Sequence, residues 1–115
     1  MSNTITGKRG EEIACGYLKK MGYTILERNI HFSRNCELDI IAKNKQGTLI
    51  AIEVKTRKNT LLGTPFEAIT PKKYNNIKQG LYTYLQSHPE FKNFQIDAIA
   101  IVLEPKISLQ HLKNI

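Results

Sequence analysis

The chain has 115 residues, of which 41% are hydrophobic and 23% are charged, and its formal net charge is +7. We expect a single domain over residues 1–115, large enough to bury a core without disulfide or metal staples. The longest apolar run, 98–103, is too short to span a membrane, and the N-terminus does not resemble a secretion signal. These features predict a cytoplasmic protein without a membrane partner, and the positive charge favours a polyanionic one.

The first predicted element is a helix over residues 11–21, which Gly22 would end. Its apolar positions fall on one stripe: Ile13, Ala14, Tyr17, Leu18 and Met21. Glu11 lies at the edge of this stripe and can face the sheet, whereas Glu12 faces water. Favourable charge in the first helical turn explains Glu11 equally well, so both interpretations stay open.

Residues 24–32 alternate as a strand, and two further strands enclose a polar turn with Gly47, which suits a β-hairpin. The expected register pairs Lys43 with Leu49, Ile41 with Ala51, Asp39 with Glu53, and Glu37 with Lys55. Because side chains alternate along a strand, one face of the hairpin is wholly apolar and needs a cover. That face carries Leu38, Ile40, Ala42, Ile50, Ile52 and Val54.

The opposite face of the hairpin carries charge, which a buried strand accepts only with a partner or a function. Directly opposed residues place their Cβ atoms roughly 5 Å apart, so Asp39 and Glu53 repel each other unless a cation lies between them. Mg²⁺ binds a few carboxylate oxygens and keeps waters for a substrate phosphate. The alternative is two ion pairs on a solvated face, Glu37–Lys55 and Asp39–Lys55, in which one lysine serves two acids.

A second helix is expected from Thr70 and Pro71, as cap and first-position proline, to about residue 87. Strands over 95–103 and 106–111 follow, Asp97 is interpreted as a strand-end turn residue, and the three histidines are assigned no role. The basic residues predicted to bind nucleic acid are Arg34, Arg57, Lys58, Lys72 and Lys73; solubility explains the last two equally well. Since helices must cover the apolar hairpin face, the predicted fold class is α/β, with a mixed sheet flanked by helices.

Three stretches of the sequence match a known family: Gly-Lys-Arg-Gly-Glu-Glu-Ile-Ala at 7–14, Glu-Leu-Asp-Ile-Ile at 37–41 and Ile-Glu-Val-Lys-Thr-Arg at 52–57. With the αβββαβ order of elements, they resemble the PD-(D/E)xK, or restriction-endonuclease-like, superfamily. Nearly the whole chain more closely resembles the YraN family of uncharacterised bacterial endonuclease-like proteins, akin to archaeal Holliday-junction resolvases. The departures are Cys36, where that family usually has glycine, and Gln95-Ile96 in place of Arg-Phe before Asp97.

The resemblance implies that Glu11, Asp39, Glu53 and Lys55 form a nuclease-like catalytic site. In such a site Asp39, Glu53 and Glu11 would hold Mg²⁺ or Mn²⁺, and Lys55 would position the attacking water and steady the phosphate. The implied function is a metal-dependent endonuclease acting on DNA, with branched or single-stranded DNA as candidate substrates. The alternative is a non-catalytic nucleic-acid-binding or adaptor module that keeps the fold, and a homodimer would enlarge the footprint of either.

Overall fold

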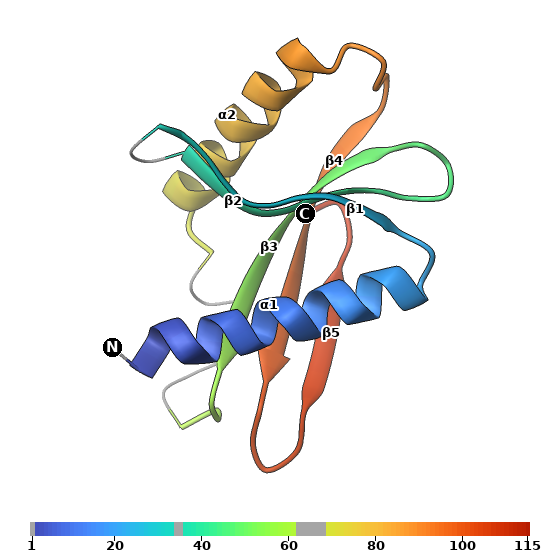
Figure 1. Ribbon diagram of the computed structural model, residues 1–115. Helices are drawn as coiled ribbons and strands as arrows, with labels where there is room; N and C mark the ends of the chain where they lie inside the picture. The colour runs from blue at the N-terminus through green and yellow to red at the C-terminus, as the bar shows by residue number, and fades with distance from the viewer. Residues whose placement is uncertain (1, 34–35, 62–68) are drawn as a thin grey trace.

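Two helices cover opposite faces of a five-stranded sheet (Figure 1); the computed structural model describes residues 2–33, 36–61 and 69–115. In chain order the elements are α1 (Ser2–Lys20), β1 (Thr24–Ser33), β2 (Cys36–Lys43), β3 (Leu49–Arg57), α2 (Pro71–Ser87), β4 (Phe94–Val102) and β5 (Ser108–Leu112). The strands lie side by side in sequence order; β3 and β4 run parallel, and the other neighbours run antiparallel. The predicted α/β class and the mixed sheet are confirmed.

The β2–β3 hairpin has the expected register near its turn. Two of the expected pairs are present, Lys43 with Leu49 and Ile41 with Ala51. Gly47 has a positive φ of 85° in the turn, a conformation that residues with a side chain rarely adopt. The paired section extends to Ile40 and Ile52, so Asp39 and Glu53 come directly after the last backbone pair.

The apolar residues of the sheet divide into two cores, one beneath each helix. The core beneath α1 includes Ala14, Leu18, Ile40, Ile52 and Ile99. The core beneath α2 includes Leu38, Ile41, Leu49, Ile77 and Leu81. Complete burial of such a side chain contributes roughly 1.5–3 kcal/mol, so these cores fix the positions of the two strands that carry the buried charges.

The prediction that Leu38 shares a face with Ile40 is wrong. Leu38 packs beneath α2, with its side chain against Gly80, whereas Ile40 packs beneath α1. The alternation breaks at Asp39, between the two residues, where the neighbouring strand β1 has Asn29 at a positive φ of 51°. The residues on either side of Asp39 therefore face different helices.

Helix α1 begins at Ser2, well before the predicted start, because no proline interrupts residues 2–10. Glu11 therefore lies in the middle of the helix, and the first-turn explanation of its charge is wrong. Gly10 lets the helix approach β3 closely, since a Cβ atom at this position would overlap the Thr56 side chain. The close approach brings the neighbouring Glu11 towards the strand that carries Glu53.

The helix ends follow the predicted signals. Thr70 caps α2 by accepting a hydrogen bond from the backbone N–H of Lys73, and Gly22, with a φ of 93°, follows the end of α1. Met21 is 52% exposed rather than part of the apolar stripe, because it comes after the last residue of α1. Within the described ranges, neither helix combines the length and the apolar character that a membrane crossing requires.

Candidate active site

The charged end of the hairpin brings Asp39 of β2 against β3. Asp39 Oδ2 accepts a hydrogen bond of 2.9 Å from the backbone N–H of Val54. The bond gives that N–H a partner at the point where the backbone pairing of β2 and β3 has ended, and it holds one carboxylate oxygen in place. Asp39 and the adjacent Glu53 therefore lie together in the fold.

The surroundings of Asp39 disfavour its charged form. Burial is the largest cause and repulsion by Glu53 is the next, and they raise the pKa of Asp39 from 3.8 to about 7. The hydrogen bond from Val54 opposes this rise, whereas hydrogen bonding to Glu53 and repulsion by Glu11 add to it. A second carboxyl group this close disfavours the charged form of Asp39 unless a cation lies between the two.

Glu53 is 3% exposed, and one of its oxygens forms salt bridges with two ammonium groups. Lys55 Nζ lies 3.2 Å from Glu53 Oε2, and Lys73 Nζ lies 3.4 Å from the same atom. Lys55 comes from the same strand, whereas Lys73 comes from the first turn of α2. A buried carboxylate needs partners of this kind, because an unpaired charge in the interior is strongly destabilising.

The solvated-face explanation of these charges is wrong. Glu53 is almost completely buried, and it is Glu53 that forms the salt bridge with Lys55. The exposed Glu37 instead lies 3.3 Å from Nδ1 of His31 on β1. The lysine therefore serves the buried acid pair.

Glu11 on α1 is half-buried and its charge adds to the repulsion on Asp39, whereas Glu12 is exposed and bonds Arg28 at 3.2 Å. Among the described residues, no group of three or more His, Cys, Asp or Glu side chains is placed to hold a metal ion jointly. The pair Asp39 and Glu53 still fits a hard divalent cation in its chemistry, because carboxylate oxygens are the preferred ligands and a cation would relieve the repulsion that raises the Asp39 pKa.

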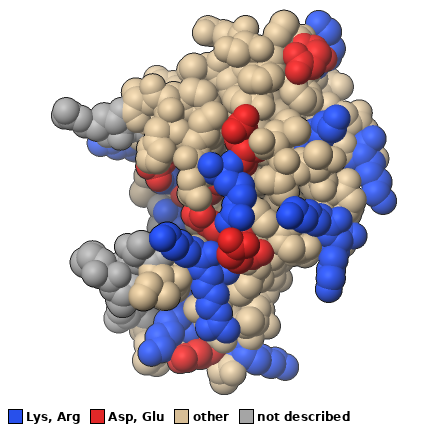
Figure 2. All heavy atoms as spheres, viewed as in Figure 1, with Lys and Arg blue, Asp and Glu red and all other residues tan. Residues whose placement is uncertain are grey.

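The basic residues predicted to bind nucleic acid differ in their surroundings. Lys58 and Lys72 are exposed, Arg57 is half-buried at the end of β3, and Lys73 forms the contact described above. Arg34 lies outside the described residues. In Figure 2, lysine and arginine side chains spread over the face that α1 crosses, with acidic side chains between them.

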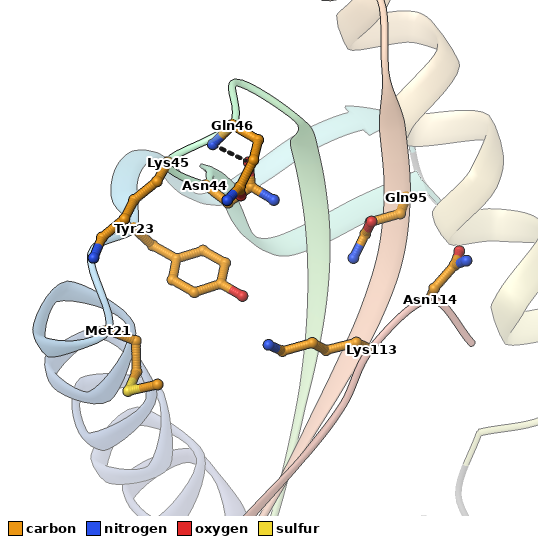
Figure 3. Close-up of a pocket in the computed structure, with 8 residues that line it drawn as sticks. All are labelled: Met21, Tyr23, Asn44, Lys45, Gln46, Gln95, Lys113 and Asn114. Carbon is orange, nitrogen blue, oxygen red and sulfur yellow. Dashed lines mark hydrogen bonds between the residues drawn. The ribbon is translucent and has the colours of Figure 1, made fainter.

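A cavity of about 450 Å³ lies elsewhere, where the end of α1, the β2–β3 turn, the start of β4 and the residues after β5 meet (Figure 3). The hydroxyl group of Tyr23 and the ammonium group of Lys113 point towards each other across it. Its lining is polar apart from Met21 and includes neither the acid pair nor the lysines that bond Glu53. The cavity is therefore separate from the candidate active site.

A family model matches residues 10–101, a span that contains both acids of the pair and both lysines; its description is uncharacterised protein family UPF0102. The chain belongs to the UPF0102 family. The expected family is thereby confirmed, and its description names no activity.

Relatives within UPF0102 cover almost the whole chain. A UPF0102 protein of Syntrophomonas wolfei is 42% identical over 114 residues, which are 97% of each chain. A UPF0102 protein of Dictyoglomus turgidum is 39% identical over 118 residues, 99% of this chain and 98% of that one. A UPF0102 protein of Trichlorobacter lovleyi is 36% identical over 115 residues, 97% of this chain and 90% of that one.

This UPF0102 chain also holds a buried polar network, and the interpretation of Asp97 as a turn residue is wrong. Asp97 lies within β4 and is fully buried. It accepts hydrogen bonds from Gln95 Nε2 at 2.9 Å, from His111 Nε2 at 2.7 Å and from the Asn114 backbone N–H at 2.9 Å. His111 Nδ1 lies 2.8 Å from the hydroxyl group of Tyr17 on α1. An acid within an apolar strand was the available signal, since such a group requires partners.

Proposed function

We propose that this UPF0102 protein is a metal-dependent endonuclease that hydrolyses phosphodiester bonds of DNA. The observation that carries the proposal is the meeting of Asp39, Glu53 and Lys55, with the pKa of Asp39 raised to about 7 by burial and by the second acid. Asp39 and Glu53 would hold Mg²⁺ or Mn²⁺, and Glu11 would join them only if its side chain turned towards the pair. A bound divalent cation would supply Lewis-acid polarisation of the phosphodiester and activation of a water molecule.

The side chains would orient the reacting groups. The N–H of Val54 holds Asp39 Oδ2, so this carboxyl group keeps one orientation without the help of a ligand. Glu53 is shielded from water, which strengthens every charge interaction at the site. The ammonium group of Lys55, held 3.2 Å from Glu53 Oε2, can donate to a phosphate oxygen and stabilise the negative charge that develops on it.

The charge of the chain supports nucleic acid as the substrate. The net charge is +7, and the exposed Lys58 and Lys72 follow β3 and open α2, the two elements that supply Lys55 and Lys73. Contacts of lysine with phosphates give affinity without reading the base sequence. Branched and single-stranded DNA are therefore the first substrates to test.

Cleavage assays with plasmid, single-stranded and four-way-junction DNA in Mg²⁺ or Mn²⁺ test the proposal. Asp39→Asn and Lys55→Ala should each lower the cleavage rate by about 100-fold or more, because each removes a group that acts on the transition state. Glu37→Gln is the matched control, since Glu37 is an exposed acid of the same strand and should leave cleavage unchanged. Circular dichroism checks that each variant is folded.

Cleavage that persists in both Asp39→Asn and Lys55→Ala would overturn the assignment of this site. Salt-sensitive DNA binding without cleavage in either metal would favour the non-catalytic binding module, whose log affinity should fall linearly with log salt concentration.

A further inference from the structure

Lys73 is unusual among the basic residues at the start of α2, because its side chain turns inward to a buried acid. Its Nζ atom lies 3.4 Å from Glu53 Oε2, the oxygen that already accepts Lys55 at 3.2 Å. The side chain of Glu53 is 3% exposed, and that of Lys73 is 34% exposed. One carboxylate oxygen thus holds two ammonium groups that come from different elements of the fold.

A divalent cation bound by the acid pair would enter the same space. Its repulsion with each ammonium group would be twice that between two ammonium groups at the same separation, because the Coulomb energy follows the product of the charges. The low water content around Glu53 weakens screening and strengthens this repulsion. A divalent cation at Glu53 therefore disfavours the contacts of Lys55 and Lys73 with this carboxylate.

Of the two lysines, Lys73 is the one that can leave. Lys55 lies on β3, where its backbone pairs with Ala100 of β4, and its side chain is 24% exposed. Lys73 reaches across from α2 and is the more exposed of the two. Its backbone N–H is held by the Thr70 cap, so the flexible stem of the side chain can swing outward while the helix stays in place.

We propose that Lys73 is an exchangeable counter-ion of the active site. It neutralises Glu53 while the site holds no metal, gives way when a divalent cation binds, and then binds a phosphate of the DNA substrate. This inference rests on the proposed function, because it requires the acid pair to bind a cation. It gives Lys73 a role that the neighbouring Lys72, which is exposed, does not share.

A titration of the metal-free protein with Mn²⁺ alone, followed by calorimetry, tests the first step. Lys73→Met keeps most of the apolar stem and removes the competing charge, so it should tighten Mn²⁺ binding roughly tenfold. Lys72→Met removes a charge at the adjacent position and should change the affinity by about twofold or less. Lys73→Arg restores the charge and should bring the affinity back to that of the wild type.

The second step is tested by DNA binding with and without Ca²⁺, as a cation that occupies carboxylate sites with little cleavage. In the wild type, Ca²⁺ should strengthen binding of a short duplex, because it releases Lys73 towards phosphate. Lys73→Met should lose most of this gain. Lys72→Met should weaken binding by a similar factor in both conditions, as expected for a plain phosphate contact.

The outcomes separate this inference from the proposed function. Absence of Mn²⁺ binding in the wild type, or equal binding in the wild type and Asp39→Asn, would overturn both. Suppose instead that Mn²⁺ binding depends on Asp39 and yet is no tighter in Lys73→Met than in the wild type. That result would overturn the counter-ion role of Lys73 and leave the proposed function standing. If Ca²⁺ strengthens DNA binding by Lys73→Met as much as by the wild type, the transfer of Lys73 to the substrate is overturned.

Discussion

Asp97 and Asp39 are both acids within a strand of the same sheet, yet their surroundings differ in kind. Asp97 on β4 is fully buried and accepts three hydrogen bonds, one of them from an imidazole at 2.7 Å. Asp39 on β2 accepts one backbone hydrogen bond and has a second acid, Glu53, as its neighbour. The first acid is surrounded by donors, and the second is placed against a like charge.

The difference separates an acid with a structural role, Asp97, from the acid that we propose to act in the active site, Asp39. A buried carboxylate with donors on both oxygens holds its neighbours in a single arrangement. An acid whose pKa is raised by a neighbouring carboxylate lowers the stability of the protein at a pH where it is charged, and a bound cation would relieve that repulsion. Asp97 is fully buried and Asp39 is half-buried, but the clearer difference lies in their partners: donors surround Asp97, and a like charge faces Asp39.

The largest expected effect is at Asp97. Asp97→Asn removes the charge that bonds His111 and puts an amide N–H₂ where an acceptor is required, so the free energy of unfolding should fall by about 3–5 kcal/mol. Urea denaturation measures the change. Glu90→Gln, which neutralises an exposed acid after α2, is the control and should change stability by about 0.5 kcal/mol or less. A small effect at Asp97 would mean that the network does not hold β4, β5 and α1 together.

At Asp39 we expect the corresponding substitution to raise the free energy of unfolding rather than lower it. Asp39→Asn keeps an oxygen for the N–H of Val54, provides a donor for Glu53 and removes the repulsion, so the metal-free protein should gain about 1–3 kcal/mol of stability at pH 8. Urea denaturation in the presence of a chelator measures the gain. Loss of stability in this variant would show that favourable contacts compensate the charge of Asp39 to the same degree as they compensate the charge of Asp97.

The pH dependence of stability is a second test of the destabilising charge at Asp39. The pKa of Asp39 is about 7 in the folded chain against an ordinary 3.8, so between these values the folded protein holds more protons than the unfolded one. The stability of the wild type should therefore fall as pH rises from about 4 to about 7, by at most about 4 kcal/mol. Asp39→Asn should lack this component, and saturating Mn²⁺ should remove it from the wild type.

The acid pair was predictable from sequence because it depends on local rules. A turn with Gly47 sets the hairpin register, and strand alternation then brings Asp39 and Glu53 to the same end of the hairpin. The alternation failed at Leu38, which packs beneath α2 although Ile40 packs beneath α1. No pattern within β2 indicates this change of face.

The partners of the buried acids were beyond prediction because they depend on how distant elements pack. The contact of Lys73 with Glu53 requires the position of α2 over β3, which the amphipathic pattern of the helix leaves open. The network of Asp97 requires the β4–β5 register and the place of α1 at once, since its donors come from both. Sequence therefore locates the acids, whereas tertiary packing decides which of them is compensated.

The smallest expected effect is at the outer end of the Asp97 network. A carboxylate can only accept, so His111 donates from Nε2 to Asp97. In the neutral ring Nδ1 then accepts from the hydroxyl of Tyr17, whose pKa is raised by burial and by Asp97. Tyr17→Phe removes this bond and should cost about 1 kcal/mol. Tyr23→Phe is the matched control, because the Tyr23 hydroxyl points into the cavity of Figure 3, and it should cost about 0.5 kcal/mol or less. Equal losses in thermal denaturation would mean that the tyrosine ring, rather than the hydrogen bond to His111, joins α1 to the network.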